Sequence, residues 1–244
     1  MQDFSTPTQV SSAVVLAGGL GTRLRSAVPD LPKPMAPIHD RPFLEHQLDY
    51  WIDQGVNLFV LSVGYRREIT KSHFGNSYRG ARIFYADEEK PLGTGGGLLL
   101  AVDMLTSEQP ILVMNGDTYF EVPLDELVTF HTQNNSDWTF SLFRTKETKR
   151  YMGMESASNG RIMSFSSNVG EKSELLANGG VYLVEPSIFN SIEYSKGEML
   201  SLEDDLLRTL IDSGRRFFGY ECKGRFIDIG IPEDYVLASH LLRG

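Results

Sequence analysis

The chain has few of the residues that build disulfide frameworks, zinc sites or membrane spans. Its single cysteine, Cys222, excludes an intramolecular disulfide, and its five histidines form no Cys/His cluster with zinc-site spacing. No apolar run approaches the roughly 20 residues that cross a bilayer, and no positively charged segment precedes an apolar run near Met1. These absences predict a soluble, cytoplasmic protein that does not bind membranes.

Long runs of basic residues are also missing. Lys and Arg number 23 against 32 Asp and Glu, which gives a net charge of −9, and no basic run exceeds a pair such as Arg66-Arg67. Proteins bind nucleic acids mainly through Lys and Arg contacts with phosphates, so this composition argues against a nucleic-acid partner. A site for a small phosphorylated ligand would depend on a few well-placed cations within an acidic overall field.

Apolar runs and helix-like spacings alternate through the first half of the chain. The expected strands lie at 12–17, 58–63, 81–86 and 111–114, with helices at about 42–54, 66–74 and 95–105 between them. Buried strands that alternate with helices predict a three-layer α/β/α fold with a mostly parallel central sheet. In sheets of this kind, ligands bind beyond the carboxyl ends of the strands.

From about residue 137 the pattern changes to shorter strands. These are expected near 138–143, 152–156, 161–165, 180–184, 217–220 and 226–229, with a loop at 166–174 and helices from Ser201 and Pro232. No linker, repeat or low-complexity stretch separates the two parts. The sequence therefore predicts a single domain over 1–244, with a nucleotide-binding half at about 12–136 and a second, substrate-binding half at about 137–240.

A glycine-rich segment, Leu16-Ala17-Gly18-Gly19-Leu20-Gly21-Thr22-Arg23-Leu24, follows the first expected strand. Glycines let backbone N–H groups approach phosphate oxygens, and Arg23 would add a guanidinium beside them. Leu24 stands where a Rossmann fingerprint needs its third glycine, and no Gly-Lys-Ser/Thr follows, which argues against a nicotinamide dehydrogenase and a P-loop. Lys33, held between two prolines, is a second candidate phosphate contact. An ordinary turn and a solvated lysine are the plain alternatives.

These two motifs, with four later ones, resemble the signature of sugar-1-phosphate nucleotidyltransferases. The later ones are Pro91-Leu92-Gly93-Thr94-Gly95-Gly96, Asn115-Gly116-Asp117, Asn178-Gly179-Gly180-Val181-Tyr182 and 226–235, in the family's order. The last motif most resembles the D-glycero-D-manno-heptose 1-phosphate guanylyltransferase branch. The resemblance implies a Rossmann-like nucleotide-diphospho-sugar transferase fold. It also implies that a sugar 1-phosphate attacks the α-phosphorus of a nucleoside triphosphate, releasing pyrophosphate and supplying polysaccharide biosynthesis.

The resemblance also implies roles for individual residues. Arg23 and Lys33 are the expected catalytic cations. Asp117 and Asp228 are the expected ligands of Mg²⁺, a hard cation that carboxylate and phosphate oxygens bind, with a cap and a structural hydrogen bond as their alternative roles. The expected nucleotide contacts are Leu16, Gly18, Gly19, Gly21, Thr22, Glu88, Gly93 and Thr94. The expected sugar-phosphate contacts are Gly153, Asn178, Gly180 and Lys172.

Glu88 favours GTP, because a carboxylate can accept both the N1–H and the exocyclic amine of guanine. Two departures from the family pattern leave the sugar open. Tyr151-Met152-Gly153 has one residue more than the family's Tyr-Gly pair. The family's Phe-x-Glu-Lys-Pro is replaced by Phe165-Ser166-Ser167-Asn168-Val169, with Lys172 downstream. A uridylyl- or thymidylyltransferase for another sugar 1-phosphate is the alternative enzyme. A non-catalytic nucleotide-sugar-binding protein is the alternative class, and a homodimer is one assembly that the sequence allows.

Overall fold

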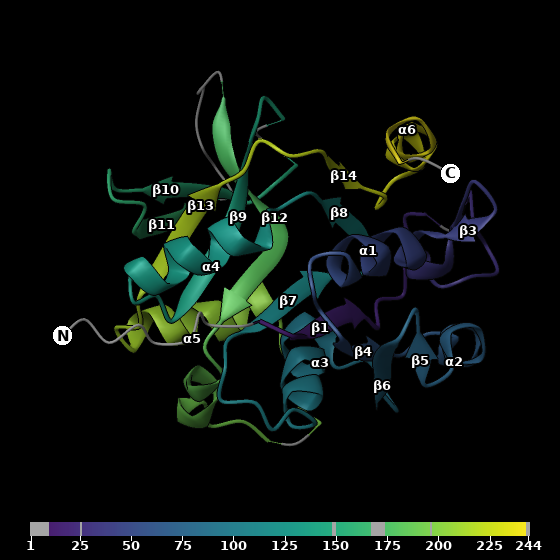
Figure 1. Ribbon diagram of the computed structural model, residues 1–244, viewed down its shortest axis with the longest axis horizontal. Helices are drawn as coiled ribbons and strands as arrows, with labels where there is room; N and C mark the ends of the chain where they lie inside the picture. Colours follow the sequence, from purple (N-terminus) through teal and green to yellow (C-terminus); the bar gives the residue numbers. More distant parts are fainter. Residues whose placement is uncertain (1–9, 25, 148–149, 167–173, 196, 243–244) are drawn as a thin grey trace.

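The computed structural model describes residues 10–24, 26–147, 150–166, 174–195 and 197–242. A mixed sheet runs through its middle, with helices on both faces (Figure 1). Its strands are β1 (Ser12–Ala17), β4 (Leu58–Val63), β5 (Ser77–Tyr78), β6 (Ala81–Asp87), β7 (Ile111–Asn115), β9 (Trp138–Thr145), β10 (Gly153–Ser156), β11 (Ile162–Ser166), β12 (Leu175–Val184) and β13 (Phe217–Glu221). The spatial order is β11-β10-β12-β7-β1-β4-β6-β5, and β9 also pairs with β12 and carries β13 beyond it.

The helices and short ladders connect and cover this sheet. The helices are α1 (Phe43–Ile52), α2 (Arg67–Phe74), α3 (Gly93–Val102), α4 (Leu124–Gln133), α5 (Leu207–Asp212) and α6 (Pro232–Leu241). Two short 3-10 helices, η1 (Lys33–Met35) and η2 (Pro186–Ser191), and one π-helical turn, η3 (Leu202–Leu206), complete the set among the described residues. Two small ladders pair β2 (Pro37–Ile38) with β3 (Arg41–Pro42), and β8 (Thr118–Phe120) with β14 (Phe226–Asp228). The predicted strands and helices are present, and most of the loop predicted at 166–174 lies outside the described residues. However, α3 starts two residues early, at Gly93, and β12 starts at Leu175 instead of 180.

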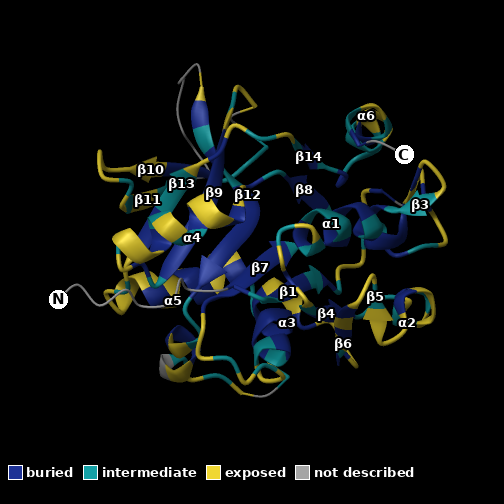
Figure 2. Ribbon diagram, viewed as in Figure 1, coloured by how far each residue is buried: buried dark blue, intermediate teal, exposed yellow. Residues whose placement is uncertain are grey.

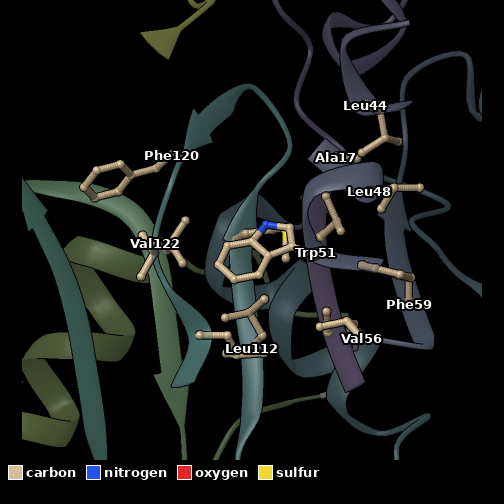
Figure 3. Close-up of a cluster of buried hydrophobic side chains, with 14 of the residues drawn as sticks. Ala17, Leu44, Leu48, Trp51, Val56, Phe59, Leu112, Phe120 and Val122 are labelled. Atoms are coloured by element: carbon tan, nitrogen blue, oxygen red, sulfur yellow. The ribbon is translucent and has the colours of Figure 1, made fainter. Parts of the chain in front are cut away.

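Side chains of the central strands alternate between two cores, one on each face of the sheet. On β1, Val15 packs into one core and Val14 into the other, as the period-2 geometry of a strand requires. The first core surrounds Trp51 of α1 (Figure 3), and the second contains Trp138 of β9. Figure 2 shows buried central strands beneath helices such as α4, whose outer face is exposed. The predicted three-layer α/β/α fold is confirmed.

The order of the parallel strands creates a crevice at one edge of the sheet. The chain moves outward from β1 to β4 to β6, and then returns to place β7 on the other side of β1. At such a reversal the connections leave in opposite directions, which opens a ligand-binding crevice beyond the carboxyl ends of the strands. Gly18 follows β1 and Gly116 follows β7, so both glycine-containing turns lie at this crevice.

The second half of the chain joins the same edge through β12, which runs antiparallel to β7. Its register against β9 shifts between Asn178 and Tyr182, and Gly180 there has a φ of 68°. A Cβ on Gly180 would lie 2.6 Å from Asn115 Nδ2, so only glycine lets this bulge approach the end of β7 closely. Parallel pairing therefore dominates the sheet around β1, whereas antiparallel pairing dominates in the second half.

Candidate active site

The crevice beyond β1 and β7 forms a cavity of about 530 Å³. Its walls come from the glycine-rich segment after β1, the turn after β7 and the beginning of α3. The residues predicted from sequence that line it are Leu16, Gly18, Gly19, Gly21, Thr22, Arg23, Lys33, Glu88, Gly93, Thr94 and Asp117. All the expected nucleotide contacts and both expected catalytic cations therefore face one space.

Lys33 enters the cavity over a glycine. Gly21 has a φ of 61°, and a Cβ there would lie 2.9 Å from Lys33 Cγ. Glycine therefore allows the left-handed turn and leaves room for the aliphatic part of the Lys33 side chain. The Lys33 side chain is 12% exposed, and its Nζ donates to Asp117 Oδ2 at 2.7 Å. The mostly buried ammonium and the carboxylate form an ion pair that faces the cavity.

Asp117 and Asp228 meet through the β8–β14 ladder. Asp228 pairs with Thr118, and Ile229 N donates to the carbonyl of Asp117 at 3.0 Å. Burial raises the pKa of Asp228 above its usual range, and the nearby charge of Asp117 adds to the rise. Asp228 also makes the structural hydrogen bond considered from sequence, accepting from Gly230 N at 2.6 Å.

This carboxylate pair suits a divalent cation. In the part of the chain that the structure describes, no cluster of three or more His, Cys, Asp or Glu side chains is arranged to hold a metal. Mg²⁺ is usually held by one or two carboxylates, with phosphate oxygens and water completing its octahedron, so two aspartates beside a cavity that can admit phosphates match its needs. Like charges held together in a partly buried place also cost free energy that a bound cation would relieve.

Glu88 forms part of the floor of the cavity and is 8% exposed. Its carboxylate accepts hydrogen bonds from Ser62 Oγ at 2.9 Å and from Leu92 N at 3.1 Å. A Cβ on Gly18 would overlap Glu88 Oε1, and one on Gly97 would lie 3.0 Å from the same atom. The two glycines therefore make room for a carboxylate whose position is fixed by hydrogen bonds.

The helix expected from about residue 95 begins at Gly93, so Gly93 and Gly95–Gly97 form the first turns of α3. Residues 198–202, here called the crossing segment, pass over this end of the helix. Gly95 N donates to Leu200 O at 2.9 Å, Leu200 N donates to Leu92 O at 2.8 Å, and Leu202 N donates to Thr94 Oγ1 at 2.9 Å. A Cβ on Gly95 would lie 2.9 Å from Ser201 O, so the close approach of two backbones requires glycine here.

A second cavity of about 170 Å³ adjoins the first and shares Asn115 with it. Three predicted residues line it: Asn178, Gly180 and Asp228. Gly153 is buried in β10, where it pairs with Ala177, and its neighbours Tyr151 and Met152 line the cavity instead. Lys172 lies outside the described residues.

Arg150 and Gln47 are site residues that the sequence did not identify. Arg150 lines the second cavity, with Nη2 3.6 Å from Asp228 Oδ2 and an ion pair to Asp234. Buried Gln47 donates to Asn115 O at 2.7 Å and to Thr118 O, which fixes the turn that carries Asp117. The sequence signals that could have identified them are the position of Arg150 next to Tyr151 and the amide of Gln47 on the apolar face of α1.

Comparison with known proteins gives consistent matches along the chain. Residues 12–243 match the family model described as nucleotidyl transferase. The D-glycero-alpha-D-manno-heptose 1-phosphate guanylyltransferase of Aneurinibacillus thermoaerophilus is 41% identical over 231 residues, which cover 95% of this chain and 98% of that protein. The Campylobacter jejuni protein of the same name is 37% identical over 223 residues, covering 91% and 96%.

A solved structure agrees with these matches. The crystal structure of HddC from Yersinia pseudotuberculosis complexed with GMP-PN superposes with a TM-score of 0.82 and 31% identity, covering 96% of this chain and 100% of that one. Nucleotidyltransferases of this family generally use a divalent metal ion. None of the helices that the structure describes is both long and apolar enough to cross a membrane.

Proposed function

The chain belongs to the nucleotidyl transferase family, and from this premise we propose that it transfers GMP from GTP to a sugar 1-phosphate. The proposed sugar is D-glycero-α-D-manno-heptose 1-phosphate, the substrate in the names of the 41% and 37% identical relatives. An oxygen of the sugar phosphate attacks the α-phosphorus, the bond to the β-phosphate oxygen breaks, and GDP-sugar and pyrophosphate form. The GDP-sugar would then supply the synthesis of a surface polysaccharide.

One observation carries this proposal. The Lys33–Asp117 ion pair and the neighbouring Asp228 stand where the two cavities meet. A triphosphate in the larger cavity and a sugar phosphate in the smaller one would present their reacting groups at that junction. Holding two reactants in this way lowers the barrier by removing the entropy of their encounter.

The residues around the junction divide the chemistry between them. The attacking phosphate oxygen is already an anion near neutral pH, so no group has to accept a proton. Arg23 and Lys33 offset the negative charge that moves toward pyrophosphate, and the backbone N–H groups of Gly18, Gly19 and Gly21 hold phosphate oxygens. Asp117 and Asp228 would hold Mg²⁺, which neutralises phosphate charge when bound.

The remaining nucleotide contacts keep the roles proposed for them, and Gly180 borders the proposed sugar cavity. Leu16, Thr22, Gly93 and Thr94 surround the nucleotide, and Glu88 accepts hydrogen bonds from guanine. We propose that the chain acts as one domain in the cytoplasm, where nucleoside triphosphates are available. Whether it forms a homodimer is tested by light scattering on the purified protein.

A pyrophosphate-release assay tests the function directly. Four nucleoside triphosphates are combined with heptose, mannose, glucose and galactose 1-phosphates in the presence of Mg²⁺. GTP with the heptose 1-phosphate is expected to give the highest kcat/KM, and EDTA is expected to abolish turnover. Equal rates with UTP, dTTP or CTP for every sugar would contradict the GTP assignment. Inactivity with every pair would favour the non-catalytic alternative.

A further inference from the structure

Glu203 points to a determinant of sugar choice that no motif identified. It lies in the first turn of η3 and lines the 170 Å³ cavity together with Asn178. At ~30 Å³ for each water molecule, the cavity holds the volume of about six waters, which suits one sugar ring. Glu203 is thus one of the polar groups that a sugar ring in this cavity would meet.

The other charged side chains of this cavity are already occupied. Arg150 pairs with Asp234 and lies near Asp228, and Asp228 faces Asp117. Among the described residues, Glu203 makes no ion pair; its hydrogen-bond partner is the amide of Asn178. A carboxylate has about four acceptor positions, so Glu203 can accept further hydrogen bonds from donors that enter the cavity.

Asn178 itself has little capacity left to bind a sugar. Its Nδ2 donates to Tyr182 Oη at 2.9 Å, and its Oδ1 accepts from Gly180 N at 3.0 Å. The second Nδ2 hydrogen is available for Glu203, with which Asn178 is hydrogen-bonded. Tyr182 is 1% exposed, so the amide is anchored to a rigid part of the core. Asn178 therefore holds Glu203 in position.

The backbone of Glu203 is fixed as well. It directly follows the crossing segment, which is hydrogen-bonded to Leu92, Thr94 and Gly95 at the start of α3. Ser201 caps the turn by accepting from Asp204 N at 3.1 Å. The Glu203 side chain itself is exposed, so its carboxylate is open to a ligand that enters the cavity. The fixed backbone preorganises the position of this carboxylate.

We propose that Glu203 selects the sugar, with its carboxylate accepting hydrogen bonds from hydroxyl groups of the sugar 1-phosphate while Asn178 positions it. This inference rests on the proposed function and adds a residue to it. Sugar hydroxyls are donors, and two neighbouring hydroxyls can satisfy both carboxylate oxygens at once. Glu203 belongs to the sugar site alone, because it does not line the nucleotide cavity.

The test compares Glu203→Gln with Asp204→Asn, a matched control that removes the same charge from the next residue, whose side chain is 75% exposed. For Glu203→Gln, the KM for the sugar 1-phosphate is expected to rise about 10- to 100-fold, as when a hydrogen bond to a charged group is lost. The KM for GTP and the unfolding temperature are expected to stay unchanged. Asp204→Asn is expected to keep all wild-type values.

Deoxy analogues of the preferred sugar 1-phosphate, each lacking one hydroxyl, identify the contact. The analogue that lacks the contacted hydroxyl should have a raised KM with the wild type but a smaller relative increase with Glu203→Gln. An unchanged sugar KM in Glu203→Gln, with an active wild type, would overturn the inference and leave the proposed function standing. A wild type inactive with every sugar 1-phosphate would overturn both.

Discussion

Replacement of Lys33 by methionine tests the chemistry of the junction most directly. Lys33 Nζ lies 2.7 Å from Asp117 Oδ2. Two unit charges at that distance interact by about 6 kcal/mol at an effective dielectric constant near 20, and by about 1.5 kcal/mol in bulk water. A phosphate oxygen at a similar distance would gain an interaction within this range. Because Lys33 is only slightly exposed, we expect an interaction energy in the upper part of this range.

The expected loss follows from these limits. If about 3 kcal/mol of charge stabilisation disappears from the transition state, kcat falls by roughly 100- to 1,000-fold, which also matches the cost of removing one preorganised donor. The free energy of unfolding should fall by about 1–3 kcal/mol, because Lys33 is mostly buried and Asp117 loses its partner. Lys33→Met should therefore still fold but turn over poorly.

The assay is pyrophosphate release at saturating GTP and sugar 1-phosphate, with thermal unfolding measured on the same preparations. Lys71→Met is the matched control, because Lys71 Nζ pairs with Asp87 Oδ2 at 2.8 Å and does not line the cavity. This control should retain the wild-type kcat. A folded Lys33→Met protein with a kcat within about threefold of the wild type would refute a transition-state role for the ammonium.

Three further substitutions test other parts of the site. Glu88→Gln should lower kcat/KM for GTP about tenfold or more while leaving that for UTP nearly unchanged, since an amide matches guanine poorly; an unaltered preference in competition assays would count against base recognition by Glu88. Asp228→Asn should abolish turnover yet raise the unfolding temperature at pH 7. The raised pKa of Asp228 means that its charge destabilises the fold at pH values above the usual pKa of 3.8. The gain in unfolding temperature should therefore shrink as the pH falls toward 3.8, and a gain that does not depend on pH would contradict this cause. Gly95→Ala should raise KM for both substrates by displacing the crossing segment, and kinetics identical to the wild type would show that the segment can shift freely.

The nucleotide side of the site could be predicted because its signals are local. Glycines directly after a buried strand, followed by Lys33 between two prolines, specify where backbone and cation meet, and the α/β pattern specifies which edge of the sheet they share. The structure brings all of these predicted residues to one cavity. Short-range sequence patterns are sufficient for this kind of site.

The meeting of Asp117 and Asp228 could not be read from local patterns. It depends on the register of β8 against β14, strands from opposite halves of the chain. The sequence connected the two aspartates only through the family resemblance. Gln47, which fixes the turn before β8, was missed because an amide within a helical apolar stripe gives no hint of its distant partners.

Tertiary contacts also explain why α3 begins at Gly93 and not at about residue 95. Glycine costs about 1 kcal/mol per residue in a helix interior relative to alanine, so a run of glycines disfavours a helix start. Here the backbone of the crossing segment occupies the space that side chains would take, and its hydrogen bonds to Gly95 and Leu92 help to stabilise the turn. Glu203 escaped notice for a related reason, since Glu203-Asp204-Asp205 reads as a solvated acidic helix start.

The crossing segment has a consequence for how enzymes of this architecture can diverge. One short stretch of backbone is attached to the wall of the nucleotide cavity, and the residue that follows it reaches the sugar cavity. The preference for the base and the preference for the sugar therefore depend on each other. A chimera that takes 137–240 from a relative with another sugar must carry a crossing segment that still fits Gly95 and Gly96. Chimeras should be active when the crossing segment and the start of α3 come from the same parent.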